Sequence, residues 1–159
     1  MGTLLDLLPF LEGWEYNLKK TEVAEIYPGV HGELLPASGV RDIIFAEKEL
    51  GWLVGGGFLV VGNNAEQTWL TLRTDNWVWR GQIVGMYLWG MTMRGIVAPY
   101  LTRYDTVNNI YGLSVDLAYP LPYKSQARVS IEAPSQNPVV IGGVFSTIRI
   151  KPEVGMREK

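Results

Sequence analysis

The sequence predicts an all-β domain, a jelly-roll-like sandwich or barrel of about seven to eight strands with a short N-terminal helical arm. Short apolar or alternating segments recur between residues 40 and 150, and turn residues separate them roughly every 8 to 14 positions. Long connections rich in Pro and Gly favour a jelly roll, in which two sheets share one core. The 159 residues suffice to bury such a core without a metal or disulfide.

The first predicted element is a short amphipathic arm that Pro9 limits in length. Its apolar face either folds against its own domain or docks on a neighbouring subunit. In the second reading the oligomer contacts are the five leucines of the segment, Leu4, Leu5, Leu7, Leu8 and Leu11.

Three regions are expected along the chain. Residues 1–39 form the arm and an irregular segment, broken at 28–29, Gly32 and Pro36, with at most one short strand near 22–27. Residues 40–150 form the β-sandwich or barrel, and residues 151–159 form a charged tail.

The first half of the β region contains four predicted strands. Residues 41–46 and 52–61 alternate or run apolar, and the pair at 63–64 supplies a turn. Residues 67–74 follow, with Leu70 and Leu72 on one face. Residues 83–93 are apolar on both faces, so we expect a strand covered on both sides.

The second half alternates more regularly. Residues 110–118 and 126–132 predict half-buried strands, and 139–150 predicts a last strand with a bulge at Gly142 and Gly143. The Tyr-Pro-Leu-Pro-Tyr stretch at 119–123 predicts a rigid connection rather than a central strand, because proline lacks an amide donor.

Charge is distributed unevenly. Residues 1–49 hold 9 acidic and 4 basic side chains, whereas only 12 of the 101 residues from 50 to 150 are charged. We therefore expect much of the β region's surface to be covered in an assembly. No basic stripe points to nucleic acid, and no apolar segment is long enough for a membrane-spanning helix.

Few residues could carry catalysis. Without cysteine and with His31 as the one histidine, the chain offers no cysteine-based or multi-histidine metal centre, and we expect no metal, no cofactor and no enzymatic activity. Asp75 and Asp105 adjoin turn signals and are expected to shape those turns. Asp116 and Glu132 are expected to be solvated charges on outward faces.

Aromatic residues are the other functional resource. If residues 74–81 are extended, Trp77 and Trp79 share one side and could stack on sugar rings, with Asn76 or Asp75 binding hydroxyl groups. Equally open are a core position and a subunit contact for both rings. Arg103 and Asp105, two residues apart, predict an ion pair, with a ligand contact or inter-subunit bridge as alternatives.

The low charge, the apolar arm, the two-faced strands and the 119–123 connection resemble viral or bacteriophage jelly-roll structural proteins of the capsid or decoration kind, over residues 40–150. The resemblance implies assembly as trimers or larger rings through arms and sheet edges, possible contacts with other virion proteins, and a place in the virion. The expected function is thus a non-enzymatic, self-assembling structural protein; the alternative is a carbohydrate-binding module that uses Trp77 and Trp79.

Overall fold

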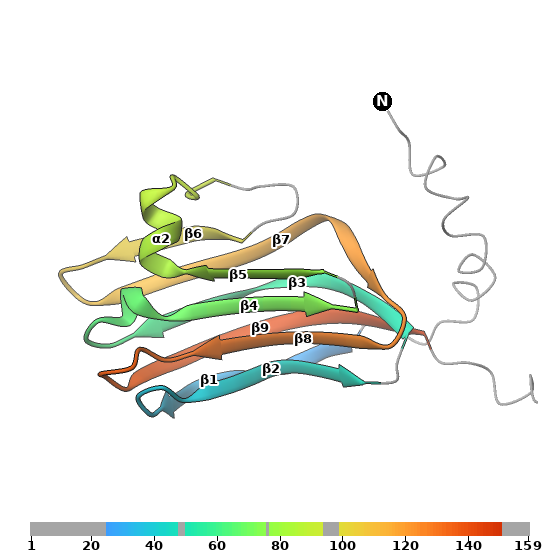
Figure 1. Cartoon of the computed structure of the whole chain (residues 1–159), viewed down its shortest axis with the longest axis horizontal. Coiled ribbons are helices and arrows are strands. Elements are labelled where there is room, and N and C mark those ends of the chain that lie inside the picture. Colours follow the sequence, from blue (N-terminus) through green and yellow to red (C-terminus); the bar gives the residue numbers. More distant parts are fainter. Residues whose placement is uncertain (1–24, 48–49, 76, 94–98, 151–159) are drawn as a thin grey trace, which may run out of the picture.

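The structure, a computed structural model, describes residues 25–47, 50–75, 77–93 and 99–150 and is a sandwich of two antiparallel sheets (Figure 1). The five-stranded sheet has the order β1-β9-β3-β7-β6, and the four-stranded sheet has the order β2-β8-β4-β5. The elements are β1 (Glu25–Leu35), β2 (Val40–Glu47), β3 (Leu50–Val61), η2 (Ala65–Gln67), β4 (Trp69–Thr74), β5 (Val78–Gln82), α2 (Ile83–Leu88), β6 (Tyr100–Asp105), β7 (Ile110–Tyr123), β8 (Gln126–Glu132) and β9 (Val139–Ile150).

The strands pair as a nested set. β1 pairs with β9, β2 with β8, β3 with β7 and β4 with β5, so that a long hairpin is in effect rolled up, and β6 is added beside β7. This is the pairing order of a jelly roll, in which the rolled hairpin contributes strands to both sheets. The predicted jelly-roll-like all-β sandwich is confirmed, with nine strands among the described residues.

One hydrophobic core lies between the sheets. Alternate residues of each strand point inward, as β8 shows with Ala127, Val129 and Ile131 buried and their neighbours partly exposed. The largest side chains come from both sheets and include Tyr111, Phe145, Ile44 and Leu72. Phe58 and Phe145 stack with ring centroids 6.0 Å apart, which joins β3 to β9 in the middle of the sheet.

The sheet begins before the predicted boundary at residue 40. β1 pairs with β9 from Glu25 to Leu35, where an irregular segment was expected. Its register slips on either side of Val30, and these irregularities absorb the Pro28 and Gly32 that signalled irregular chain.

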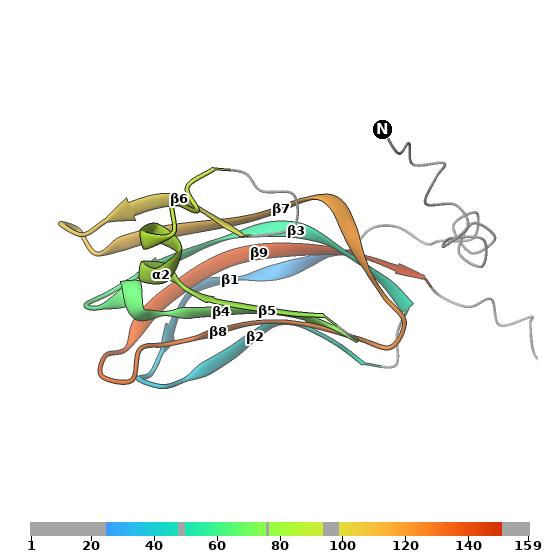
Figure 2. The same cartoon turned by 45° about the horizontal axis from the view of Figure 1, so that its top comes forward.

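The strand predicted over residues 83–93 is wrong. The chain forms helix α2 instead, which buries Ile83 and Met86, three residues apart, and turns Tyr87 and Leu88 outward. β5 is the edge strand of its sheet, so the chain must leave that sheet there to reach β6 at the edge of the other. Figures 1 and 2 show α2 beside β6 at this side of the sandwich.

Two further expectations about local geometry are wrong. Residues 119–123 continue β7, and Pro122 pairs with Trp52 of β3. β6 covers β7 only from Ile110 to Ser114, so beyond that point one edge of β7 is open and a proline there loses no ladder bond. β9 runs without a register shift against β3 through Gly142 and Gly143; the bulges lie in β1 and β3.

Five predictions concern parts of the chain that the structure does not describe. These are the helical arm, its leucine contacts Leu4, Leu5, Leu7, Leu8 and Leu11, the side chain of Asn76, the side chain of Asp116, and the charged tail at 151–159.

Candidate functional site

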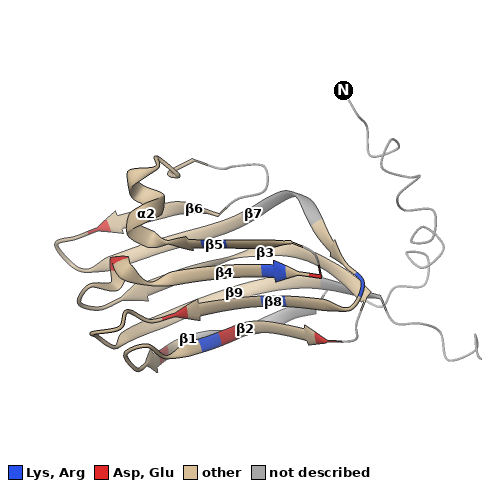
Figure 3. Cartoon of the chain, viewed as in Figure 1, with Lys and Arg blue, Asp and Glu red and all other residues tan. Residues whose placement is uncertain are grey.

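The two sheets present chemically different outer faces. The four strands of the smaller sheet contain seven charged residues, whereas β3, β7 and β9, the three central strands of the larger sheet, contain two. Figure 3 shows the charges gathered on β2, β8, β4 and β5. The smaller sheet therefore has the surface of a solvated face, and the larger sheet does not.

On the charged face the side chains pair with one another. Arg80 donates to Glu132 at 2.7 Å and lies 4.5 Å above the centre of the Trp69 ring. Arg128 contacts Asp42 through two nitrogens, at 2.7 and 3.1 Å. These cross-strand pairs leave the carboxylates occupied, and being largely exposed they contribute little to stability.

A group of apolar side chains projects from the side of the sandwich. We call it the knob: Tyr87 and Leu88 of α2 with Trp89 and Met93 just after it. Leu88, Trp89 and Met93 are 76%, 86% and 79% exposed. Large apolar side chains at such exposure, in a stretch with no charged residue from 81 to 93, are typical of an interaction surface.

The knob is held in place by its backbone. Gly90 lies in the left-handed region at φ +69°, its N–H donates to the carbonyl of Tyr87, and Met91 N–H donates to the carbonyl of Met86. This pair of bonds is a Schellman motif, which ends α2 and fixes the position of Trp89. The backbone of Met91 also accepts a hydrogen bond from Leu101 at the start of β6.

The Tyr87 ring anchors the helix to the sheet. It stacks on Tyr104 of β6 with centroids 4.0 Å apart and planes 7° from parallel, and Tyr104 meets Tyr111 of β7 edge-on at 5.1 Å. The hydroxyl of Tyr111 donates to Glu66 at 3.2 Å. Burial, with the nearby charge of Glu66, raises the pKa of Tyr111 to about 12 and raises that of Tyr104.

A second feature lies on the outer face of the larger sheet. We call it the trough, an open concavity of about 510 Å³ across β9, β3, β7 and β6. None of the described residues that line it is charged. Gly57, Gly142 and Gly143 form its floor, and Leu59, Val144 and Thr102 stand at its sides.

Gly143 and Gly57 differ in whether packing within the chain requires glycine. A Cβ on Gly143 would lie 2.6 Å from the carbonyl oxygen of Gly57, so the close approach of β9 to β3 requires glycine there. A Cβ on Gly57 would meet only the Leu113 carbonyl oxygen at 3.6 Å, an ordinary contact. Packing within the chain therefore leaves room for a side chain at residue 57.

The residues of the predicted sugar platform are placed as follows. Trp79 pairs with the buried Leu72 across β4 and β5, and both Trp77 and Trp79 pack partly buried against the core. The carboxylate of Asp75 accepts hydrogen bonds from three backbone N–H groups of residues 124–126 and from the Ser125 hydroxyl. Asp75 was predicted to shape the turn beside it, but these bonds hold the turn between β7 and β8, about 50 residues further along the chain.

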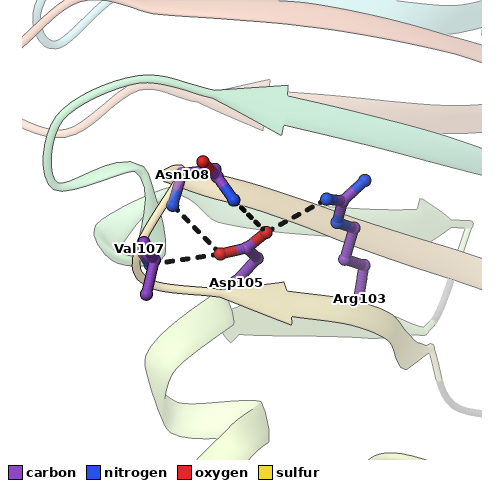
Figure 4. A network of polar contacts seen from close by, with 4 residues as sticks. All are labelled: Arg103, Asp105, Val107 and Asn108. Atoms are coloured by element: carbon purple, nitrogen blue, oxygen red, sulfur yellow. Dashed lines mark hydrogen bonds and ion pairs between the residues drawn. The ribbon is translucent and has the colours of Figure 1, made fainter.

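Asp105 organises the β6–β7 turn, as predicted (Figure 4). Its carboxylate accepts hydrogen bonds from the N–H groups of Val107 and Asn108, at 3.1 and 3.0 Å, and from the side-chain amide of Asn108 at 2.9 Å. The predicted ion pair with Arg103 is present at 3.0 Å. Hydrogen bonds, first those from Asn108, hold the pKa of Asp105 well below its ordinary value.

Within the described residues, no cluster of three or more His, Asp or Glu side chains is arranged to hold a metal ion. None of the helices in that part of the chain has the length and apolar character needed to cross a membrane. No protein-family model matches the sequence, and no curated protein is similar to it.

Sequence reasoning missed the knob. It assigned Leu88 to one face and Trp89 and Met93 to the other face of a buried strand, because an apolar residue at every position fits both a covered strand and an exposed helix end. The signal that could have found the helix end is Gly90, a residue typical of a helix C-terminus.

Proposed function

We propose that this protein is a non-enzymatic structural subunit that assembles with copies of itself, of the kind found in a virion capsid or decoration layer. The observation that carries the proposal is the knob, where Leu88, Trp89 and Met93 are more than three-quarters exposed on a rigid support. A rigid apolar projection costs little ordering entropy on binding, which favours a contact surface.

The distribution of charge supports the same proposal. The outer face of the larger sheet exposes Leu59, Val140 and Val144 on β3 and β9, while the Arg80–Glu132 and Arg128–Asp42 ion pairs lie on the other sheet. Four carboxylates have structural partners: Asp75 and Asp105 bind turn amides, and Asp42 and Glu132 pair with arginines. The proposal assigns none of them a catalytic role.

The test is the solution mass of the purified full-length protein, measured by light scattering over a range of protein and salt concentrations. We expect a trimer or a larger closed assembly whose mass changes little with salt, because apolar contacts are not screened. A monomer at every concentration would reject the proposal.

The N-terminal leucines are proposed as a further contact. Removing residues 1–12, which include Leu4, Leu5, Leu7, Leu8 and Leu11, should lower the oligomeric mass and leave the β-sandwich folded by circular dichroism. An unchanged mass with a lower melting temperature would mean instead that the arm packs on its own domain.

Glycan binding is the alternative function. It rests on the part of each ring that Trp77 and Trp79 leave exposed while they pack against the core. Replacing both with alanine should abolish retention on a glycan array if this function holds, and a wild-type protein that binds no glycan would reject it.

A further inference from the structure

From the shapes of the two uncharged surfaces we infer that the knob of one copy seats in the trough of the next copy, over the glycine floor at Gly57, Gly142 and Gly143. The inference rests on the proposed self-assembly and names the two surfaces that meet. One projects and the other is hollow, both belong to this chain, and they lie on different parts of its surface.

The first argument is the area that the knob offers. From typical side-chain sizes, the exposed parts of Tyr87, Leu88, Trp89 and Met93 amount to roughly 600 Å². A standard protein interface buries about 800 Å² on each partner. The knob thus supplies most of one side of a stable interface, and its rim would supply the rest.

The second argument is the unexplained glycine of β3. A glycine inside a strand costs about 0.5–1 kcal/mol relative to alanine. At Gly143 the close strand approach accounts for that cost, but Gly57 has room for a side chain in the isolated chain. A strand glycine that its own fold does not require is typical of a place where another group approaches closely.

The third argument is chemical matching. The described lining of the trough and the segment 81–93 around the knob contain no charged side chain. The contact therefore buries no charged group without a partner. The charged outer face of the smaller sheet, with Arg80 and Arg128, offers no comparable seat. Of the two outer faces, that of the larger sheet fits the knob, because it contains the trough.

The contact joins two different patches, so every copy offers one knob and one trough. Such a contact builds a ring when the rotation between copies closes, and an open filament when it does not. The two patches border the same strand, since Thr102 of β6 stands beside the trough and Tyr104 of β6 stacks on Tyr87. A ring has one fixed mass and a filament has a mass that grows with protein concentration, so the wild-type mass tells the two apart.

The experiment uses two full-length variants, each defective in one patch. Trp89→Ser removes the knob's largest side chain from an exposed position, and Gly57→Leu fills the trough from a position with room for it. Each variant alone should weaken self-association at least tenfold by sedimentation. An equimolar mixture should form 1:1 dimers, because the first variant keeps its trough and the second keeps its knob.

Three controls keep the result interpretable. Gly57→Ala adds one methyl group to the floor and should retain the wild-type mass. Thr71→Leu adds the same leucine to the outer face of the smaller sheet and should also retain it. Thr102→Arg places a charge at the side of the trough and should behave as Gly57→Leu, which covers the case in which the leucine variant fails to fold.

Each other outcome overturns the inference. If Trp89→Ser dissociates the assembly while Gly57→Leu and Thr102→Arg do not, the knobs meet one another. If the trough variants dissociate it while Trp89→Ser does not, the trough receives another segment, such as the N-terminal leucines. If both dissociate and the mixture stays monomeric, the patches do not bind each other. A monomeric wild type would instead reject the proposed function itself.

Discussion

The turn between β7 and β8 provides a quantitative test of how one carboxylate holds the sandwich together. Asp75 follows β4, yet it binds the Ser125 N–H at 3.1 Å, the Gln126 N–H at 2.6 Å and the Ser125 hydroxyl at 2.8 Å. Replacing Asp75 with alanine removes the acceptor, so these donors can form hydrogen bonds only with water at a surface turn. Hydrogen bonds to a charged group are worth about 1.5–3 kcal/mol each, so after discounting for exposure we expect a loss of about 2 kcal/mol.

The assay is urea denaturation followed by far-UV circular dichroism, with thermal melts in parallel. A loss of about 2 kcal/mol should lower the melting temperature by about 4–8 °C in a domain of this size. Asp75→Asn keeps an acceptor oxygen and should lose about half as much. Ser135→Ala, at an exposed position between β8 and β9, is the control and should stay within about 0.5 kcal/mol of wild type.

The effect should also depend on pH. Burial raises the pKa of Asp75, but the hydrogen bonds from Lys124, Ser125 and Gln126 outweigh it and hold the pKa below its ordinary value of 3.8. A lowered pKa contributes stability above pH 3.8 that is lost as the pH falls below it. The gap between wild type and Asp75→Asn should therefore shrink from pH 7 to pH 3. A gap that stays constant, or an Asp75→Ala loss under 0.5 kcal/mol, would refute this reasoning.

Three further predictions concern the core and the larger sheet. Gly143→Ala should destabilise the fold by about 1–3 kcal/mol in urea because its Cβ would overlap the Gly57 carbonyl, whereas Gly57→Ala should not; equal losses would contradict the packing argument. Phe145→Ala, which empties a fully buried site stacked on Phe58, should cost about 3–5 kcal/mol by the same assay, and a loss below 1.5 would mean that the site collapses. Tyr111→Phe should be about 1 kcal/mol less stable than wild type at pH 8 through loss of the bond to Glu66. Because the pKa of Tyr111 is raised to about 12, wild type loses that advantage between about pH 10 and 12, so stability curves that run parallel there would contradict the assignment.

The sequence predicted best where one face of a strand is buried. β8 and β9 begin and end where the alternation begins and ends, and β2 and β3 differ by one or two residues from their predicted bounds. Alternation records the difference between a dry and a wet face, so it finds strands that have both. The turn role of Asp105 was also predictable, because aspartate next to a turn binds its amides, whereas the amides that Asp75 binds lie about 50 residues away in the sequence.

The remaining errors share a physical cause, because each depends on neighbours that a sequence does not name. Pro122 fits in β7 because β6 is too short to cover that edge. Residues 83–88 are a helix because β5 is the last strand of its sheet. Trp77 and Trp79 pack on the core, a placement that the sequence left open among core, contact and sugar platform.

The nested pairing also sets an order of events during synthesis. In the described sheet β1 has a single neighbour, β9. The partner of Glu25 is Thr147, which is translated 147 − 25 = 122 residues later. At roughly 5–20 residues per second, that strand remains unpaired for about 6–24 s on the ribosome. The trough is built from β3 and β9 together, so it does not exist on a nascent chain. Any partner that binds this surface can therefore bind only chains that have been translated through β9.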